Sequence, residues 1–475
     1  MKSYSQFYIN GGWVDSHSST LTSVINPATE AQIATVPEGN AQDVDDAVMA
    51  ARAAFESWSN TPSAERADII RRVSDLLEQR VDEIAAVISA ELGSPIAHAK
   101  AVQSEEPIEG MRMYADFCSM MDEDQEEGNS LIVKEAIGVC SFINPWNYPL
   151  LQIVGKVAPA LAAGCTMVVK PSEVTPLNAF ILAEIMDEAG VPAGVFNLVS
   201  GLGPVVGEAM CVHPEVDMVS FTGSTRAGVR IAELAAPSVK RVCQELGGKS
   251  PMIITEDLSA EEFATAVEYA MGDVMFNSGQ TCTALTRLLV PAYRLAEANA
   301  VAKAYVEGLK VGEPGDEEAF LGPMSSAQQR NTVLNYIQIG IDEGAELVSG
   351  GVERPAGFSQ GYYVSPTVFS QVNNQMRIAR EEIFGPVTCI LPYQNLAEAI
   401  TVANDTPYGL SSAVWAGSKD AGLAIARKLR AGQVYVNGGE YNFLAPFGGY
   451  KQSGNGREWG REAMHEFIEV KAIQL

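Results

Sequence analysis

Residues 137–149 read I-G-V-C-S-F-I-N-P-W-N-Y-P, an apolar run that stops at an asparagine and two prolines. A short apolar run bounded by such turn residues is typical of a buried strand, and a helical pattern follows the second proline. The same unit recurs further along the chain, with apolar segments at 166–169, 195–199, 218–221 and 239–243. Strands that alternate with helices predict a parallel sheet covered by helices, and therefore an α/β fold.

Polar or glycine-rich turns follow all five predicted strands. They lie at 144–149, 170–173, 201–207, 222–225 and 245–249. In an open parallel sheet, ligands bind outside the carboxyl ends of the strands. Five such turns at one edge therefore predict a ligand-binding crevice.

These turns carry the elements of a dinucleotide site. The glycine run at 201–207 is spaced G-x-G-x-x-x-G, one residue longer than the usual fingerprint, and such runs often only mark turns. Gly223 and Ser224 at the start of a helix add backbone N–H groups and a helix dipole that suit a pyrophosphate. Lys170 and Glu173 suit ribose hydroxyls, and a carboxylate there repels a ribose 2′-phosphate. NAD is therefore favoured over NADP as the cofactor.

A second α/β region follows the first. Its predicted helices include 295–309 and 396–403. Its predicted strands lie at 252–255, 285–290, 387–391, 413–415 and 434–436. The chain therefore has two α/β domains, as its 475 residues also suggest.

Cys282 is the candidate nucleophile. It stands in M-F-N-S-G-Q-T-C-T-A (275–284), a polar turn with a glycine, whereas buried structural cysteines usually sit in apolar strands or helices. The alternative is a surface turn that holds an idle thiol. Because Cys282 belongs to the second region, we expect it to face the dinucleotide crevice across the domain junction, where small-molecule sites are common.

The remaining segments are helical or form a tail. Apolar residues at helical spacing predict helices at 44–58, from 63 onward, and up to a stop at 93–95. A short predicted strand at 131–133 has no partner nearby in the sequence. The tail at 467–474 reads as an exposed strand that could pair with 131–133 or with another subunit.

The composition excludes several classes of function. The chain has 59 acidic and 32 basic residues, and its net charge of −27 repels nucleic acids and anionic membranes. Seven cysteines without C-x-x-C spacing and four scattered histidines argue against a disulfide framework or a metal site. The N-terminus lacks the apolar core of a signal peptide, which predicts a cytoplasmic protein.

Seven motifs in order resemble those of the aldehyde dehydrogenase superfamily. They are P-W-N-Y-P, K-P-S-E, F-T-G-S-T, E-L-G-G-K-S, G-Q-T-C-T-A, E-E-I-F-G-P and P-F-G-G-Y-K-Q-S-G-N-G-R-E. The resemblance spans nearly the whole chain and implies oxidation of an aldehyde to a carboxylic acid with NAD. It also implies a homodimer or homotetramer built from three parts: a Rossmann-type NAD-binding domain (1–115 and 137–247), a catalytic domain (248–447) and a small β oligomerisation element (116–136 and 448–475).

The same resemblance implies roles for four residues. Cys282 attacks the aldehyde carbon to form a thiohemiacetal, and Asn147 with the backbone N–H of Cys282 stabilises the oxyanion. Loss of hydride to NAD leaves a thioester, and Glu245 is the general base for its hydrolysis. Lys156 matches a lysine near the nucleophile, although the same lysine on a solvated helix face would have no such role.

Further positions match the family's binding residues. Those for the cofactor are Trp146, Lys170, Ser172, Glu173, Gly203, Gly207, Phe221, Gly223, Ser224, Leu246, Gly247, Glu382 and Phe384. Those for the substrate are Tyr148, Gln152, Thr281, Thr283 and Phe447. Gly155 stands where the family often has a large aromatic residue, which predicts a wider substrate pocket.

Two alternatives keep the same fold. One is an enzyme that transfers the acyl group to coenzyme A, but acylating members generally lack the base that Glu245 matches. The other is an inactive binding protein, which the combination of Cys282, Asn147 and Glu245 disfavours. Cofactor-free ester hydrolysis by the same thiol is expected only as a side activity.

Overall fold

The apolar run at residues 137–149 forms strand β7 (Val139–Ile143), in the middle of an eight-stranded sheet. The computed structural model describes all residues 1–475. The order of strands in this first sheet is β19-β11-β10-β7-β8-β9-β1-β2. The other strands are β1 (Gln6–Ile9), β2 (Gly12–Asp15), β8 (Thr166–Lys170), β9 (Phe196–Leu198), β10 (Met218–Thr222), β11 (Arg241–Glu245) and β19 (Gly454–Asn455).

The five strands predicted from the sequence are parallel and adjacent, which confirms the predicted sheet. The outer strands β1, β2 and β19 run antiparallel to their neighbours. Because β8 lies on one side of β7 and β10 lies on the other, the chain reverses its direction of progress across the sheet at β7. Such a switch point opens a crevice at the carboxyl ends of the strands.

Strand β11 begins later than the sequence pattern indicates. The prediction placed it at 239–243, whereas the strand spans Arg241–Glu245. Val239 has a left-handed backbone (φ 54°) and is almost fully exposed after the short helix Ala236–Ser238, so it cannot start a buried strand. Glu245 is therefore the last residue of β11 and not the first residue of a loop.

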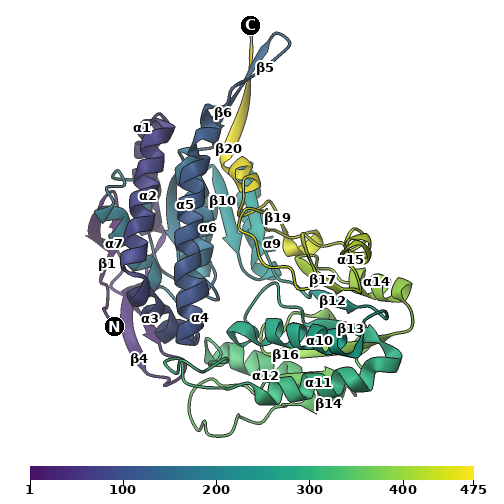
Figure 1. The fold of residues 1–475 in the computed structure, drawn as a ribbon. Helices are drawn as coiled ribbons and strands as arrows, with labels where there is room; N and C mark the ends of the chain where they lie inside the picture. Colours follow the sequence, from purple (N-terminus) through teal and green to yellow (C-terminus); the bar gives the residue numbers. More distant parts are fainter.

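Helices cover the first sheet. They begin and end at local signals: Asn40 caps the first helix with its side chain, and left-handed Gly93 ends the third. Figure 1 shows α2, α5 and α6 running side by side. The helices of this part are α1 (Ala41–Ser59), α2 (Ser63–Gln79), α3 (Val81–Leu92), α4 (Ile96–Lys100), the π-helix η1 (Ala101–Glu105), α5 (Glu106–Phe117), η2 (Cys118–Asp122), α6 (Pro149–Ala163), α7 (Leu177–Glu188), the π-helix η3 (Gly203–Gly207), α8 (Glu208–Val212), α9 (Thr225–Ala235) and η4 (Ala236–Ser238).

A second sheet of seven strands has the order β14-β15-β16-β13-β12-β17-β18. All neighbours are parallel except β14 and β15. Its strands are β12 (Pro251–Ile254), β13 (Arg287–Pro291), β14 (Glu346–Ser349), β15 (Thr367–Ser370), β16 (Val387–Tyr393), β17 (Ser411–Trp415) and β18 (Gln433–Val436). The five strands predicted here are confirmed, whereas β14 and β15 were not foreseen.

The second part also carries its own helices. Helices α10 and α11 pack side by side on one face of this sheet (Figure 1), and α12 packs on the other face. The helices are α10 (Ala260–Met275), η5 (Phe276–Gly279), η6 (Ala292–Arg294), α11 (Leu295–Gly308), α12 (Ala327–Asp342), α13 (Arg377–Arg380), α14 (Leu396–Asn404), α15 (Lys419–Ala426) and η7 (Lys451–Ser453). The last short helix, η8 (Glu462–Phe467), packs instead against α6 in the core of the first part.

Two small sheets complete the fold. Strands β3 (Leu21–Ile25) and β4 (Gln32–Pro37) form a hairpin, and β20 (Ile468–Gln474), β6 (Ser130–Ala136) and β5 (Gln125–Glu127) form an arm that projects from the body (Figure 1). The tail strand pairs with the segment around 131–133, one of the two partners expected for it. The segment 448–475 is not wholly part of this arm, because β19 pairs with β11 in the first sheet. None of the helices combines the length and the apolar character that a membrane crossing requires.

Candidate active site

A cavity of about 780 Å³ opens at the carboxyl ends of β7, β10 and β11. The loop that carries Cys282, helix α12 and the segment 382–384 form its opposite wall, so residues from both sheets face one another across it. Ten residues singled out in the sequence line this cavity. They are Trp146, Asn147, Gly223, Ser224, Glu245, Leu246, Gly247, Cys282, Glu382 and Phe384.

The loop that presents Cys282 is sharply bent. Three consecutive residues that precede it, Asn277, Ser278 and Gly279, have left-handed backbones with φ of 49°, 55° and 73°. A Cβ atom on Gly279 would lie 2.1 Å from the carbonyl of Gly385, so only glycine fits there. Cys282 itself is partly exposed, in contrast to the other six cysteines, which are buried. The turn is therefore not a plain surface loop, because Cys282 lines the cavity, and the reactivity of its thiol stays a prediction.

Side-chain amides tie this loop to the first sheet. Asn147 Nδ2 donates to the carbonyl of Gln280 at 2.9 Å, and Asn277 Nδ2 donates to the carbonyl of Asn147 at 3.0 Å. Gln280 Oε1 in turn accepts from the backbone N–H of Ser325 at 2.8 Å. An amide group has two N–H bonds, so Asn147 retains one donor beside Cys282.

Burial and the charges of three carboxylates, Glu382, Glu245 and Glu458, act on the thiol of Cys282. Burial is the largest influence, and the charges of Glu382 and Glu245 add to it, so the pKa of the thiol lies well above its usual range. The backbone N–H of Cys282 acts in the opposite direction because it hydrogen bonds to the sulfur. The thiol is therefore protonated in this state and needs a base to become a nucleophile.

Glu245 has no hydrogen-bond partner for either carboxylate oxygen, although its side chain is buried. Burial raises its pKa well above the usual range, and the negative charge of Glu458 raises it further. The positive charges of Lys156 and Arg457 partly oppose this effect. An unpartnered buried carboxyl group on a cavity wall is suited to accept a proton from water or from a thiol.

Lys156 is completely buried, so its reading as a solvated helix lysine is wrong. Its Nζ lies 2.7 Å from the Glu458 carboxylate and donates to Thr222 Oγ1 at 2.7 Å and to the carbonyl of Gln152 at 3.3 Å. This ion pair lies behind Glu245 and does not line the large cavity. Lys156 therefore acts on the site through the charge that it shares with Glu458.

On the opposite wall, Glu382 and Phe384 project from a strained segment. The backbone N–H of Gly248 donates to Glu382 Oε1 at 2.9 Å, and burial raises the pKa of Glu382 to about 7. Phe384 has a left-handed backbone (φ 58°), and its ring meets the Trp146 ring edge-on at 5.3 Å between centroids. Gln329 Nε2 holds the segment by donating to the carbonyl of Phe384 at 2.8 Å.

Other residues expected to bind the cofactor lie beyond this cavity. Lys170 Nζ donates to the carbonyl of Pro171 at 2.8 Å and lies 3.4 Å from Glu173 Oε2. A Cβ atom on Gly207 would lie 3.9 Å from the Lys170 side chain, so the glycine segment adjoins this pair. Three other residues expected to bind the cofactor do not line the large cavity either. Gly203 has open space beside it, and Phe221 is buried next to Gly223. The Ser172 hydroxyl accepts a hydrogen bond from the backbone N–H of Val174.

None of the residues expected to bind substrate lines the large cavity. The hydroxyls of Tyr148 and Thr281 lie 2.6 Å apart, and Thr283, which follows Cys282 in the sequence, is partly buried. Phe447 pairs with Glu458 through two backbone hydrogen bonds of 2.7 and 2.8 Å. Gln152 is buried, and its carbonyl bonds to Lys156 as described above.

Gly155 does not leave the wider pocket that its sequence position suggested. A Cβ atom on Gly155 would lie 3.1 Å from the indole ring of Trp459, and a Cβ atom on Gly110 would lie 2.7 Å from the same ring. The ring also meets Phe443 edge-on at 4.9 Å between centroids. A tryptophan from a distant part of the chain therefore fills the space beside the glycine.

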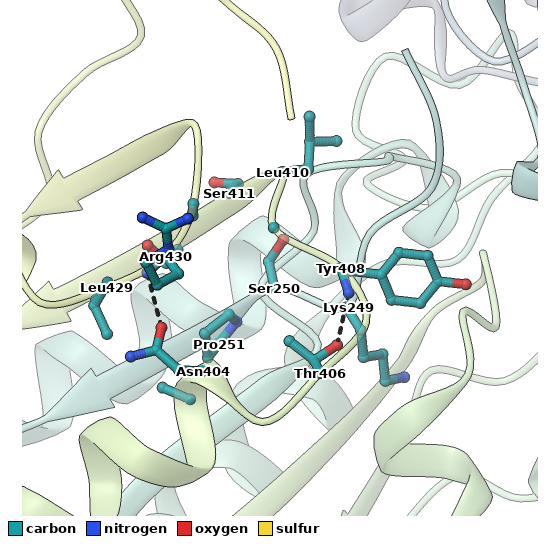
Figure 2. Close-up of a pocket in the computed structure, with 14 residues that line it drawn as sticks. Lys249, Ser250, Pro251, Asn404, Thr406, Tyr408, Leu410, Ser411, Leu429 and Arg430 are labelled. Atoms are coloured by element: carbon teal, nitrogen blue, oxygen red, sulfur yellow. Dashed lines mark hydrogen bonds between the residues drawn. The ribbon is translucent and has the colours of Figure 1, made fainter. Parts of the chain in front are cut away.

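A second, smaller cavity of about 250 Å³ lies beneath the loops 403–412 and 429–431 (Figure 2). Hydrogen bonds shape its wall, from the N–H of Arg430 to Asn404 Oδ1 at 2.7 Å and from the N–H of Tyr408 to Thr406 Oγ1 at 3.2 Å. None of the residues expected for catalysis, cofactor or substrate lines it. We therefore place the active site at the larger cavity.

Four residues of the site were not singled out from the sequence. Gln329 and Thr332 line the cavity from α12, and nothing in their local pattern distinguishes them from other helix residues. Glu458 is the last residue of the motif P-F-G-G-Y-K-Q-S-G-N-G-R-E, and Trp459 directly follows the motif. The position of Glu458 in that motif was the available signal for it.

Comparison with known proteins points to one family. Residues 13–473 match the family model described as the aldehyde dehydrogenase family. The chain is 49% identical to a 3-succinoylsemialdehyde-pyridine dehydrogenase from a Pseudomonas species, over all of this chain and 99% of that protein. A solved mutant of aldehyde dehydrogenase C from Pseudomonas syringae, in complex with NAD+ and octanal, has a TM-score of 0.97 and 49% identity over 99% of this chain and 96% of that one. An NAD+ complex of an aldehyde dehydrogenase from Bacillus cereus has a TM-score of 0.96 and 39% identity over all of this chain and 96% of that one.

Proposed function

Since the chain belongs to the aldehyde dehydrogenase family, we propose that it oxidises an aldehyde to a carboxylic acid with NAD through a covalent intermediate on Cys282. The observation that carries this proposal is the convergence of Cys282, Asn147 and Glu245 on one cavity that both sheets enclose. A nucleophile, an oxyanion donor and a base are the three groups that this reaction requires.

The larger cavity has the chemistry that NAD needs. Ser224 caps helix α9 at the carboxyl end of β10, where backbone N–H groups suit a pyrophosphate. Glu382 can accept hydrogen bonds from ribose hydroxyls because its second oxygen is free, and Trp146 and Phe384 offer apolar faces to a nicotinamide ring. Lys170 and Glu173 would bind the adenosine ribose, and the Glu173 carboxylate favours NAD over NADP. When bound, NAD supplies the acceptor for the hydride.

The thiol of Cys282 must lose its proton before it attacks, because its pKa is raised. Because Cys282 is partly exposed to the cavity, this proton passes to solvent, which leaves the Glu245 carboxylate free for the later hydrolysis. The Cys282 sulfur then bonds to the aldehyde carbon while the carbonyl π electrons move to oxygen. The free N–H of Asn147 and the backbone N–H of Cys282 stabilise that oxyanion.

When the oxyanion re-forms its C=O bond, the carbon releases hydride and a thioester to Cys282 remains. Glu245 takes a proton from water, the hydroxide bonds to the thioester carbon, and the C–S bond breaks to release the carboxylic acid. The absence of partners for Glu245 keeps both of its oxygens available for water. A free carboxylate at Glu245 also argues against the coenzyme A alternative, because acyl transfer to a thiol does not need a base that activates water.

The assay for this proposal is NADH absorbance with purified protein, NAD or NADP, and a panel of short, long, aromatic and semialdehyde substrates. We expect turnover with NAD, and we expect Cys282→Ala to lower kcat by about 10⁴-fold or more because no nucleophile remains. Calorimetry should show that the variant still binds NAD. No NADH with any aldehyde would leave the inactive binding protein as the better reading, and product formation only with added coenzyme A would favour the acyl-transfer enzyme.

The division into an NAD-binding part, a catalytic part and an oligomerisation element extends this proposal. The two large sheets and the projecting arm support it. We expect a homodimer or homotetramer that uses the arm, because strand β20 exposes Val470 and Ile473 at the edge of its sheet. The seven free cysteines suit a cytoplasmic location.

A further inference from the structure

Two buried amide side chains bind the nucleophile loop and the first sheet to each other in both directions. Asn147, in the turn after β7, donates from Nδ2 to the carbonyl of Gln280 at 2.9 Å. Asn277 donates from Nδ2 to the carbonyl of Asn147 at 3.0 Å and to the carbonyl of Gln280 at 3.4 Å. Only 1 to 3% of the surface of these three residues is exposed. The carbonyl of Gln280 therefore joins both amides, away from solvent.

These contacts fix Asn147 at its backbone and at its side chain. Its carbonyl accepts from Asn277, and one N–H of its amide donates to Gln280. The amide nitrogen carries two N–H bonds, and the group is planar, so fixing one N–H also fixes the direction of the other. The second N–H is the oxyanion donor of the proposed reaction, and such a donor is effective when its direction is set before the reaction. The direction of this donor therefore depends on the contacts with Asn277 and Gln280.

Asn277 holds its place at a cost to stability. Its backbone is left-handed (φ 49°), a conformation that residues other than glycine seldom adopt. Its Oδ1 atom is buried and has no partner within the chain. Both features destabilise a fold, and strain of this kind is concentrated at functional sites. The hydrogen bonds that its side chain does form go to Asn147 and Gln280, the two residues that set the oxyanion donor.

The next residue along the loop has the same conformation but different contacts. Ser278 is also buried and left-handed (φ 55°). Its hydroxyl donates to the carbonyl of Gly322 at 2.9 Å and accepts from the N–H of Gly322 at 3.1 Å. These bonds secure the loop to the segment before α12, and neither of them involves Asn147. Ser278 therefore shares the strain and burial of Asn277 without its link to the oxyanion donor.

We propose that Asn277 is a positioning residue for aldehyde oxidation: it holds Asn147 so that the free N–H of the Asn147 amide meets the oxyanion that forms when Cys282 attacks the aldehyde. This inference rests on the proposed function and adds to it a residue that acts through Asn147. The contact between Asn147 and the oxyanion strengthens as the thiohemiacetal forms. Loss of Asn277 should therefore slow formation of the thioester more than it weakens binding of the aldehyde.

The experiment compares two reactions of Cys282 in the NAD-bound protein. Stopped-flow absorbance gives the rate of the first NADH turnover with an aldehyde, which needs the oxyanion donor. Mass spectrometry gives the rate of reaction with methyl methanethiosulfonate, which forms a disulfide and no oxyanion on carbon. The reagent reports on Cys282 because the other six cysteines are buried. Asn277→Gly accepts the left-handed backbone and removes the amide, so we expect about 10 to 100-fold slower NADH formation and an unchanged rate with the reagent.

A double variant tests whether Asn277 acts through Asn147. Asn147→Ala should slow the first turnover by about 10² to 10³-fold, the effect of one oxyanion donor. Because a residue that acts only through Asn147 has nothing left to position, adding Asn277→Gly should cause no further loss. Losses that multiply in the double variant would overturn the inference. An unchanged first turnover in Asn277→Gly, or an equal fall of both reactions of Cys282, would also overturn it.

Ser278→Gly is the matched control, because it removes a side chain that bonds to Gly322 from the same left-handed stretch. The ratio between the two rates should stay at its wild-type value in this variant. A fall of that ratio equal to the fall in Asn277→Gly would assign the effect to the loop as a whole and overturn the inference. If the wild-type thiol reacts with the reagent but no aldehyde yields NADH, the proposed function itself is overturned.

Discussion

Trp459 illustrates how a single residue shapes the substrate side of the site. Its indole occupies the space beside Gly110 and Gly155, on two helices that are far from it in the sequence. Trp459 also has a left-handed backbone (φ 60°), which the packing of the ring must stabilise. A larger residue at either glycine would meet the ring, so the two glycines and the tryptophan must vary together.

The charge environment of Glu245 gives a prediction at the same scale. Glu245→Gln cannot accept a proton, so we expect one rapid turnover of NADH followed by a steady rate lowered by about 10² to 10³-fold, because thioester hydrolysis loses its base. Stopped-flow absorbance should resolve the burst. Since burial and Glu458 raise the pKa of Glu245, the wild-type steady rate should also rise with pH as this carboxyl group ionises.

The control for this prediction is Glu109→Gln, which removes a carboxylate remote from the large cavity and should turn over normally. A Glu245→Gln protein with an unchanged steady rate would show that another group is the base. A loss of the burst itself would assign Glu245 to the attack of the thiol instead of the hydrolysis.

At the scale of elements, the turn before Cys282 and the strands around it differ in how far local sequence determines them. Apolar runs bounded by proline and glycine predict β7, β8 and β10 because strand burial is a local pattern. The left-handed residues 277–279 were foreseen only as a bend, since their angles depend on contacts with the segment 384–386. The role of Glu458 could not be read from local sequence either, because it depends on an ion pair with Lys156, which is far away in the sequence.

Helix α7 provides a second prediction, because a residue of another helix caps it. The Glu91 carboxylate of α3 accepts from the N–H of Leu177 at 2.8 Å and from Asn178 Nδ2 at 2.7 Å. Burial outweighs these bonds and raises the pKa of Glu91 to about 7, from 4.5. Below pH 4.5 the carboxyl group is neutral in both states, so its contribution to stability is complete there and is lost as the pH rises through 7.

We therefore expect Glu91 to make the free energy of unfolding fall by about 3 kcal/mol between pH 5 and pH 8. Glu91→Gln does not titrate, so its unfolding midpoint should depend less on pH, although it should be less stable at pH 5 because its amide N–H groups oppose the donors of Leu177 and Asn178. Urea unfolding followed by circular dichroism at several pH values measures both effects. Parallel pH profiles for the two proteins would contradict this account.

On the scale of the whole molecule, the two large sheets were predictable and their contacts were not. Alternating strands and helices define each sheet locally, whereas the walls of the cavity are joined by contacts between distant segments, such as the hydrogen bonds of Asn147 and Asn277. The motifs shared with a known family supplied that long-range information for Cys282, Glu245 and Glu382. Thr332 and Trp459 could not be identified in this way, because neither residue belongs to one of those shared motifs.

The projecting arm gives the prediction at this scale. Strand β20 exposes Val470 and Ile473, Leu475 just beyond it is also exposed, and the outer edge of β20 lacks a partner within the chain. Removal of residues 470–475 should therefore shift the protein from an oligomer to a monomer in light scattering at micromolar concentration, because the edge strand and its apolar residues are lost. Truncation that leaves the mass unchanged, or a monomeric full-length protein, would assign the arm another role.

The pairing of β19 with β11 has a consequence for how the protein is made. Gly454 pairs with Glu245, and the N–H of Leu246 bonds to Ser453, so the edge strand that carries Glu245 is covered only by residues near the end of the chain. During synthesis at about 5–20 residues per second, that edge stays open for roughly 10 to 40 seconds. A nascent chain therefore contains Cys282 before the strand that carries Glu245 is paired along both of its edges.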